Sequence, residues 1–197
     1  MTRSAASSRE CIVRGGTIVT IDPDWRVLRG DVHAVAGEIV QVGGDATPRG
    51  HDYEILDASD ALVLPGFVQS HVHTCQTLAR GRADNLALLD WLTRVVWPYE
   101  AALSRDDVSV AARLSAAELL LGGTTAIQDM GTVRHTDAVF EALRDGGLRA
   151  LVGKAMIDTG ELVPKALAES TTDSLRSSVE LFDTWHKTAG DRLRYAF

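Results

Sequence analysis

The alternation of strand-like and helix-like runs after Leu62 constrains the fold more than any other feature. Apolar β-prone runs predict strands at residues 62–69, 124–128, 148–157 and 193–197, and helical periodicity predicts helices at 86–96, 106–121, 136–144 and 173–186. Such alternation is typical of a parallel sheet with right-handed crossovers. Three strands and the start of a fourth make half of an eight-stranded barrel, which typically takes about 250 residues. We therefore expect an α/β fold in which residues 62–197 form the first half of a TIM-type (β/α)8 barrel. A small open three-layer sheet is the alternative.

One of these helices carries clear signals at both ends. Ser104 is a candidate N-cap, and Asp106 and Asp107 in the first turn favour the helix dipole. Gly122-Gly123 is a stop signal. We therefore expect this helix to begin just after Ser104.

The stretch from residue 11 to residue 61 has a different pattern. Short β-prone runs at 12–13, 17–21, 32–35, 38–42 and 54–56 are separated by turn residues such as Gly15-Gly16. This pattern predicts hairpins in a small antiparallel sheet. The stretch is short for an independent core, so we expect an incomplete β subdomain that packs on something else. We interpret residues 1–10 as a flexible leader.

Composition excludes several classes of function. The chain is 45% hydrophobic with a formal net charge of -7, and no run of Lys and Arg interleaves with aromatic residues, so we exclude nucleic acid as a partner. The N-terminus lacks the apolar core of a signal peptide, and no window is apolar enough to span a membrane. Cys11 and Cys75 lie far apart without metal-finger or redox spacing. We predict a cytoplasmic protein with no membrane partner.

The pair His71-Val72-His73 is the sharpest chemical signal. It follows the apolar run and Pro65-Gly66, at the carboxyl end of a predicted strand. Residues two apart on a strand point the same way, so both imidazoles can face one ion, and in a barrel this end carries the active site. The alternative is a pair that is only packed or hydrogen-bonded. Two ligands are too few for a catalytic zinc site, which usually takes three protein ligands and a water.

At this point the sequence resembles the amidohydrolase superfamily. Within it, the chain is similar to the branch of guanine deaminases, methylthioadenosine and S-adenosylhomocysteine deaminases, and chlorotriazine hydrolases. The resemblance covers nearly the whole chain after the leader. It is carried by Pro65-Gly66-Phe67-Val68, His71-Val72-His73, Gln76-Thr77-Leu78, Arg80-Gly81, Leu88-Leu89-Asp90-Trp91-Leu92, Trp97-Pro98-Tyr99-Glu100, Gly122-Gly123-Thr124-Thr125 and Leu148-Arg149-Ala150.

The resemblance implies a barrel flanked by a β-sandwich, with residues 11–61 as the incomplete sandwich subdomain. His71 and His73 correspond to the family's first metal pair, which binds one divalent metal, zinc or alternatively iron. In the family this metal lowers the pKa of a bound water, and the resulting hydroxide attacks an amidine-like carbon and expels ammonia. The family's further His ligand, its His-x-x-Glu motif and its late Asp do not occur before Phe197. We therefore expect the catalytic residues beyond Phe197 and no turnover by residues 1–197 alone.

Two residues are candidates for substrate binding. Glu100 follows Trp97-Pro98-Tyr99, where adenosine-type members of the branch hold a ribose hydroxyl; the alternative is a solvated acid at a helix end. Lys154, on the predicted strand 148–157, would point at the barrel mouth. Several adenosine-type members have Arg at this position, whereas Gly153-Lys154 followed by Met156 is closer to guanine deaminases. The resemblance therefore leaves guanine, adenosine derivatives, pterins and triazines open.

Other residues carry weaker signals. Asp129 either lines the mouth or is an ordinary loop acid, and His135 and His186 are expected at helix ends or on the surface. Cys75 is interpreted as a small buried filler. Trp91 is expected in the core, although the resemblance allows it to contact substrate.

We therefore predict the front part of a metal-dependent amidohydrolase that deaminates a purine-like or other heteroaromatic amine, a small-molecule substrate. The complete enzyme is commonly an oligomer in this branch. One alternative is a hydrolase of the same fold that expels chloride or opens a cyclic amide. Another is a non-catalytic fragment that needs a complementary partner for its open sheet edge. A globular α/β protein without metal is the remaining alternative.

Overall fold

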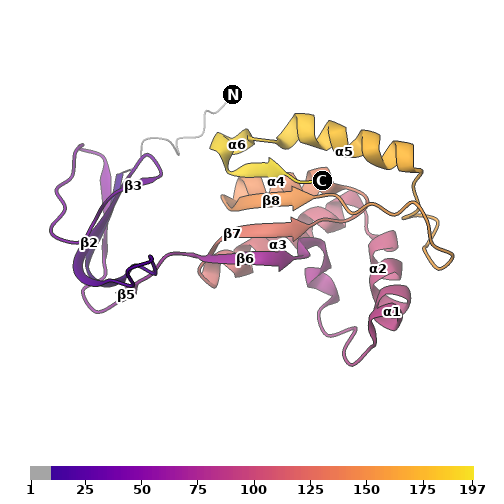
Figure 1. Cartoon of the computed structure of the whole chain (residues 1–197), viewed down its shortest axis with the longest axis horizontal. Helices are drawn as coiled ribbons and strands as arrows, with labels where there is room; N and C mark the ends of the chain where they lie inside the picture. Colours follow the sequence, from indigo (N-terminus) through magenta and orange to yellow (C-terminus); the bar gives the residue numbers. More distant parts are fainter. Residues whose placement is uncertain (1–9) are drawn as a thin grey trace. The chain divides into compact units, whose positions relative to one another are not determined.

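The computed structural model describes residues 10–197, which fall into two compact units, 10–65 and 66–197. The first unit is a five-stranded sheet in the order β3-β2-β1-β4, with β5 also paired to β1 (Figure 1). Its strands are β1 (Glu10–Val19), β2 (Val27–Val35), β3 (Glu38–Val42), β4 (Tyr53–Asp57) and β5 (Leu62–Val63). Strands β1 to β3 pair antiparallel, as expected. Strands β4 and β5 instead run parallel to β1. The expectation of a purely antiparallel sheet was wrong, because the chain between β3 and β4 crosses over instead of closing a hairpin.

The strand β1 is longer than the sequence pattern indicated. The two runs at 12–13 and 17–21 belong to one strand, which continues through a register shift between Val13 and Gly16, where Gly15 has a φ of +71°. Glu10, which we had assigned to the leader, is buried at the start of β1. The rest of the predicted leader, residues 1–9, lies outside the described residues. Residues 10–65 form one sheet, and the sandwich stays a prediction.

The second unit contains a four-stranded parallel sheet in the order β6-β7-β8-β9. Its strands are β6 (Phe67–Val72), β7 (Thr124–Met130), β8 (Arg149–Gly153) and β9 (Leu193–Tyr195). The strand predicted at 62–69 divides at Pro65-Gly66, so that its first residues pair with β1 as β5 and the rest join β6. The alternation of strands and helices in the sequence therefore does produce a parallel sheet.

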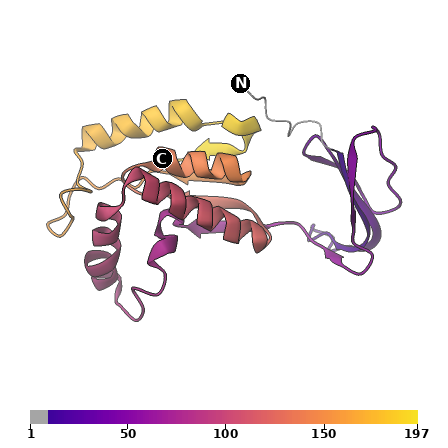
Figure 2. The same ribbon diagram turned by 180° about the vertical axis from the view of Figure 1, so that it is seen from behind.

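Helices α3 and α4 lie side by side against one face of this sheet, in front of it in Figure 2. The helical segments are η2 (Thr74–Ala79), α1 (Leu88–Trp91), η3 (Leu92–Val96), α2 (Trp97–Ala102), α3 (Arg105–Leu121), α4 (Thr136–Gly146), α5 (Thr171–Trp185) and α6 (Thr188–Asp191). The core of this unit lies between the sheet and helices α3, α4 and α5. The Phe140 ring of α4 stacks on Trp185 of α5, with centroids 5.2 Å apart, and on Tyr195 of β9, with centroids 6.3 Å apart.

The helix expected at 86–96 begins at Leu88 and continues to Ala102 through η3, a π-helical turn. Pro98 lies within this continuation. Proline has no N–H and its ring clashes with the carbonyl four residues earlier in a regular α-helix, and a wider π-helical turn is one way to accommodate such a break. The sequence pattern indicated an end at Val96 because the apolar stripe ends there.

Helix boundaries otherwise follow the local signals closely. Ser104 caps α3 in a reciprocal capping box with Asp107. Helix α4 runs to Gly146 and ends at Gly147, which has a φ of +84°. Helix α5 begins two residues earlier than predicted, after the N-cap Ser170. The strand predicted at 148–157 was too long, since β8 ends at Gly153.

Several apolar side chains of the second unit are exposed. On α5, Leu175 is 51% exposed and Val179 is 49% exposed. Phe67 and Val68, on the edge strand β6, are also exposed. Within residues 10–197, no helix has both the length and the apolar character needed to cross a membrane.

Candidate metal and substrate site

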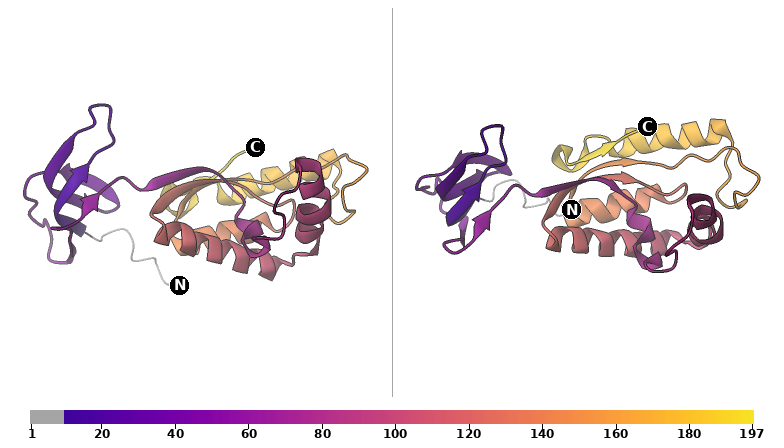
Figure 3. Two further views of the ribbon diagram at one scale, coloured as in Figure 1. Left: turned by 90° about the horizontal axis from the view of Figure 1, so that it is seen from below. Right: turned by 60° about the horizontal axis from the view of Figure 1, so that its bottom comes forward.

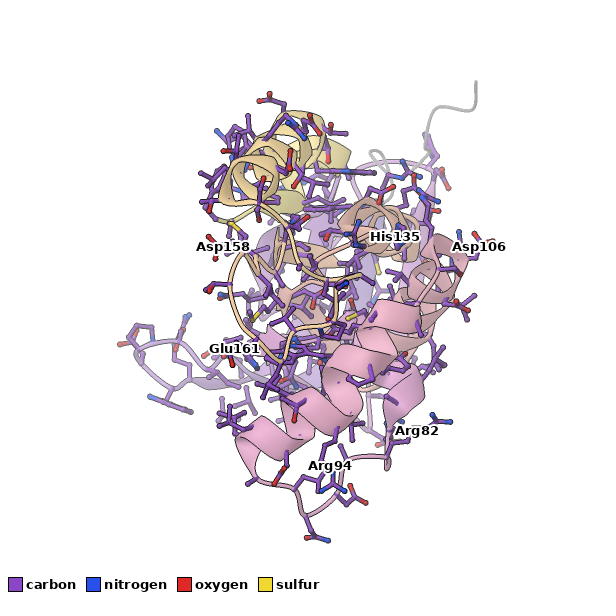
Figure 4. The ribbon with its side chains drawn as sticks, turned by 90° about the vertical axis from the view of Figure 1, so that its right-hand side faces the viewer. Arg82, Arg94, Asp106, His135, Asp158 and Glu161 are labelled. Atoms are coloured by element: carbon purple, nitrogen blue, oxygen red, sulfur yellow. The ribbon has the colours of Figure 1, made fainter. Side chains whose placement is uncertain are left out.

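The candidate site lies where β6 and β7 end, at their carboxyl edge. Figure 3 shows the segments that follow β6 leaving this edge beside α2, and Figure 4 views the same end directly. In Figure 4, Arg82 and Arg94 lie on the segments around α1, while Asp158 and Glu161 lie on the loop between β8 and α5. In parallel α/β sheets, ligands bind at this edge.

The two histidines of the His-x-His pair lie next to each other. His71 is in β6 and His73 follows its last residue, and their ring centroids are 4.8 Å apart in an edge-to-face arrangement. Nδ1 of His73 lies 2.9 Å from the carbonyl oxygen of Met130 in β7. A carbonyl can only accept, so Nδ1 carries the proton and the lone pair of Nε2 is left for a metal. The donor set of these two imidazoles fits zinc or iron.

Asp129 accepts two hydrogen bonds from Thr74, the residue that follows His73. It is 1% exposed, and its Oδ1 and Oδ2 accept hydrogen bonds from the backbone N–H and the hydroxyl of Thr74, at 3.1 Å and 2.6 Å. Burial raises the pKa of the Asp129 carboxyl, and the hydrogen bonds from Thr74 oppose this shift. Asp129 is therefore a buried residue at the carboxyl end of β7 and not an ordinary loop acid.

Glu100 lies close to this cluster. From α2 its Oε1 accepts a hydrogen bond of 2.8 Å from the side-chain amide of Gln76 and a longer contact of 3.8 Å from the Cys75 thiol. Burial raises the pKa of Glu100, while the Gln76 bond and the nearby His73 lower it in part. The hydroxyl of Tyr99 donates to the carbonyl of Cys75 at 3.0 Å, which ties α2 to η2. Glu100 is therefore a half-buried, oriented carboxyl and not a solvated acid at a helix end.

A hollow of about 240 Å³ adjoins these residues and is lined by Gln76, Arg80, Trp91 and Tyr99 among others. Trp91, for which we had considered core packing and substrate contact, is half-buried and lines this hollow. The hollow is slightly smaller than pockets for drug-sized ligands, which run from about 300 Å³ upward.

Lys154 lies just past the carboxyl end of β8, and not within a strand as the sequence indicated. It is one residue past β8, it is only 7% exposed, and its ammonium group forms an ion pair with Glu169. It also donates to the carbonyl of Ala155 and to the hydroxyl of Ser174, at 3.0 Å and 3.3 Å. These three acceptors match the three donors of the ammonium group. In this structure Lys154 therefore connects the loop after β8 to α5, and its role in substrate binding stays a prediction.

The remaining candidates are His135, His186 and Cys75. His135 is the N-cap residue of α4, in agreement with the expected helix end, although its φ is +61° and its side chain makes no capping hydrogen bond. His186 follows α5, stacks on Phe182 with centroids 4.5 Å apart and accepts from the backbone N–H of Tyr195 at 3.3 Å. Cys75 is buried in the core, as expected. In the described part of the chain, no group of three or more His, Cys, Asp and Glu side chains is placed to hold a metal ion.

Sequence reasoning missed Thr74, Met130 and the bond from Gln76 to Glu100. Gln76 belongs to a motif that we had noted without assigning a role. Thr74 follows His73 directly, which was the available signal for a supporting residue. Met130 acts through its backbone carbonyl, which leaves no signal in the side chains.

Comparison with known proteins identifies the family. The model of the Amidohydrolase family matches residues 62–197, and the chain belongs to this family. The chain is 35% identical over 186 residues to a 5-methylthioadenosine/S-adenosylhomocysteine deaminase from Symbiobacterium thermophilum, which covers 93% of this chain and 41% of that enzyme. The chain thus spans about two fifths of the length of such relatives.

Solved structures agree on the fold. An adenosine deaminase from Xanthomonas campestris with bound zinc is 31% identical, with a TM-score of 0.79 over 95% of this chain and 42% of that one. An atrazine chlorohydrolase from Arthrobacter aurescens complexed with zinc gives a TM-score of 0.84 at 24% identity, over 95% and 46% of the two chains. The second similarity concerns the fold alone. These neighbours are TIM barrels, and the chain corresponds to part of one.

Proposed function

We propose that this chain is the front part of a metal-dependent aminohydrolase that removes an amino group from a purine-like or other heteroaromatic ring. The observation that carries the proposal is the pair His71 and His73 at the carboxyl edge of the sheet, with Nδ1 of His73 bound to the Met130 carbonyl. Residues 62–197 would be the first half of the barrel, and residues 11–61 an incomplete β-sandwich subdomain.

In this proposal, His71 and His73 hold one divalent metal, zinc or alternatively iron. A metal bound there supplies Lewis acidity that activates water at neutral pH. The zinc in the adenosine deaminase and chlorohydrolase structures supports a divalent metal in the family. A further metal ligand and the acidic proton shuttle would come from outside residues 1–197.

Glu100 would bind the substrate. Its Oε1 is held by Gln76, so the carboxyl is oriented before any ligand arrives. A carboxylate accepts hydrogen bonds well from a hydroxyl or ring N–H. The raised pKa of Glu100 also makes it able to carry a proton nearer neutral pH than an ordinary glutamate.

The substrate class is supported by the relatives and not by the site alone. The Symbiobacterium thermophilum relative is named for 5-methylthioadenosine and S-adenosylhomocysteine, and the Xanthomonas campestris structure for adenosine. We therefore place an adenosine derivative first among the open substrates. Lys154 would contribute to binding only if its ion pair with Glu169 opened. We also predict that the enzyme is cytoplasmic and forms a homo-oligomer when complete. We expect neither nucleic acid nor a membrane as a partner.

A second candidate is a non-catalytic half that needs a complementary polypeptide. The exposed Leu175 and Val179 on α5, together with the exposed edge strand β6, favour it. A purified 197-residue chain that stays monomeric and well folded would count against this candidate.

The deaminase proposal is tested on the protein expressed from its complete reading frame with zinc. Ammonia release is measured with 5-methylthioadenosine, S-adenosylhomocysteine, adenosine and guanine, and chloride release with a chlorotriazine. The His73→Ala variant should lose roughly 1000-fold in kcat/KM, because metal activation supplies several kcal/mol and each 1.4 kcal/mol is tenfold. The exposed His51 in the first unit provides the matched control His51→Ala. Zinc-independent turnover, or turnover that survives His73→Ala, would refute the proposal.

A further inference from the structure

Asp129 and Met130 at the end of β7 accept hydrogen bonds from His73 and Thr74, the two residues that follow β6. The backbone carbonyl of Met130 accepts from the ring of His73, and the side chain of Asp129 accepts from Thr74. Val72 pairs with Asp129 just after a register shift between β6 and β7. The chain is therefore fixed at the point where it leaves the sheet and turns into η2.

Asp129 engages Thr74 with both of its oxygens. One accepts from the backbone N–H at 3.1 Å and the other from the hydroxyl at 2.6 Å, and both residues are fully buried. Burying a carboxylate is costly unless hydrogen bonds compensate for lost water. A valine or leucine would fill the same space without this cost, but neither could accept hydrogen bonds from Thr74. We therefore take the role of the carboxylate to be fixing the backbone at Thr74.

The fixed backbone determines where His73 points. The peptide between His73 and Thr74 carries the N–H that Asp129 accepts, so this bond sets the ψ angle of His73, which is 85°. The ψ angle and the bond from Nδ1 to the Met130 carbonyl together orient the imidazole and keep its proton on Nδ1. Partners that orient a metal-binding histidine in this way affect metal affinity by 10-fold to 100-fold.

We propose that Asp129 is a positioning residue for the metal site: by holding Thr74, it keeps Nε2 of His73 directed at the metal. This inference rests on the proposed function, since it takes His73 as a metal ligand. Asp129 touches neither the metal nor the substrate in this proposal.

The test uses the 197-residue chain and two readouts. Long-range ¹H–¹⁵N NMR of the imidazoles at pH 8 reports which nitrogen of His73 carries the proton, and the His73→Ala spectrum assigns the signal among the six histidines. Competition with a chelating dye gives the Kd for Zn²⁺. The first readout needs no metal, so it tests the positioning even if the metal proposal fails.

The variants separate hydrogen bonding from charge. Asp129→Ala removes both bonds, and it should lose the single Nδ1–H form of His73 and weaken Zn²⁺ binding by about 10-fold. Asp129→Asn can still accept from the Thr74 N–H and donate to its hydroxyl, so it should keep the tautomer and stay within about threefold in Kd. Thr74→Ser keeps both bonds and is the matched control.

An Asp129→Ala protein that is folded by circular dichroism, keeps the Nδ1–H form and binds Zn²⁺ within about threefold of the parent would overturn the inference. If Asp129→Ala does not fold, Asp129→Val decides, because it removes both bonds to Thr74 and leaves an apolar side chain in the buried space. A several-fold weaker Kd with a mixed tautomer supports the proposal, and an unchanged protein overturns it. If the 197-residue chain binds Zn²⁺ too weakly for a comparison, the Kd values are measured on the protein expressed from its complete reading frame, which supplies the further ligand. Failure of that longer protein to bind Zn²⁺, with His73 still in the Nδ1–H form, counts against the proposed function alone.

Discussion

Lys154 and Glu169 form a buried ion pair that joins the loop after β8 to the residue just before the N-cap of α5. Replacing one partner leaves a buried charge uncompensated, which typically costs about 3–5 kcal/mol. We expect Glu169→Leu to lower the free energy of unfolding by about 3 kcal/mol. The double variant Lys154→Met/Glu169→Leu should recover most of this loss. Urea unfolding followed by circular dichroism measures both, and an unstable double variant would contradict the prediction.

Gly66 is packed so closely that a side chain has no room. A Cβ at this position would overlap the side chain of Thr125, whose own Cβ would lie 2.8 Å away. We expect Gly66→Ala to destabilise the second unit by about 1–3 kcal/mol through overpacking. Thr125→Ala removes the nearest atoms and should relieve part of the cost, which a double-mutant cycle of thermal unfolding would show. Strictly additive effects would mean that the overlap is not the cause.

Ser104 begins α3 with a capping box, in which its side chain accepts from the backbone N–H of Asp107. We expect Ser104→Ala to lower stability by about 1 kcal/mol. Ser109→Ala, in the interior of the same helix, is the control and should be neutral or slightly stabilising. Chemical denaturation at neutral pH distinguishes the two, and equal effects would argue against the cap.

Asp31 makes the first unit sensitive to acid. Its carboxylate accepts from the backbone N–H groups of Ala46 and Gly15, at 2.9 Å and 2.8 Å. These bonds, with the nearby Arg14, lower the pKa of Asp31 although burial opposes them. Because the folded pKa is below the unfolded value, the stabilisation is present above about pH 4 and is lost as the pH falls through the folded pKa.

This acid sensitivity can be followed at single residues. The amide resonances of Gly15 and Ala46 should shift with a midpoint below 3.8, the ordinary value for an aspartate. Asp31→Asn should abolish the shift and flatten the acid limb of the stability curve. A midpoint at or above 3.8 in the parent protein would show that the hydrogen bonds do not favour the ionised carboxylate.

The sequence predicted the secondary structure correctly where the cause of that structure lies in neighbouring residues. The alternation after Leu62 follows from hydrophobic periodicity, and the start of α3 follows from Ser104, which lies beside the groups that it caps. The pairing of β4 with β1 was not visible, because it depends on how the chain crosses between two strands that look alike in sequence. The extent of β8 was overestimated because Ala155, Met156 and Ile157 continue the apolar run beyond Gly153.

In the candidate site, too, the sequence predicted the local features and missed those that depend on distant parts of the chain. His71 and His73 come together because they lie two residues apart where β6 ends, which the spacing reveals. The partner of the His73 ring is a backbone carbonyl 57 residues away, and no residue type marks such an atom. The contact between Lys154 and Glu169 likewise depends on how the loop after β8 leads to the start of α5.

The central position of β1 bears on how its sheet is assembled. The hairpin with β2 joins neighbouring segments, whereas the other edge of β1 pairs Glu10 with Tyr53 and therefore closes a much longer loop. Loop closure costs entropy that grows with length, and non-local pairing slows folding. During synthesis, the hairpin of β1 and β2 can therefore form before β4 and β5 have emerged from the ribosome to pair with the other edge of β1. We expect this late parallel pairing, and not the hairpin, to limit the rate at which the first unit folds.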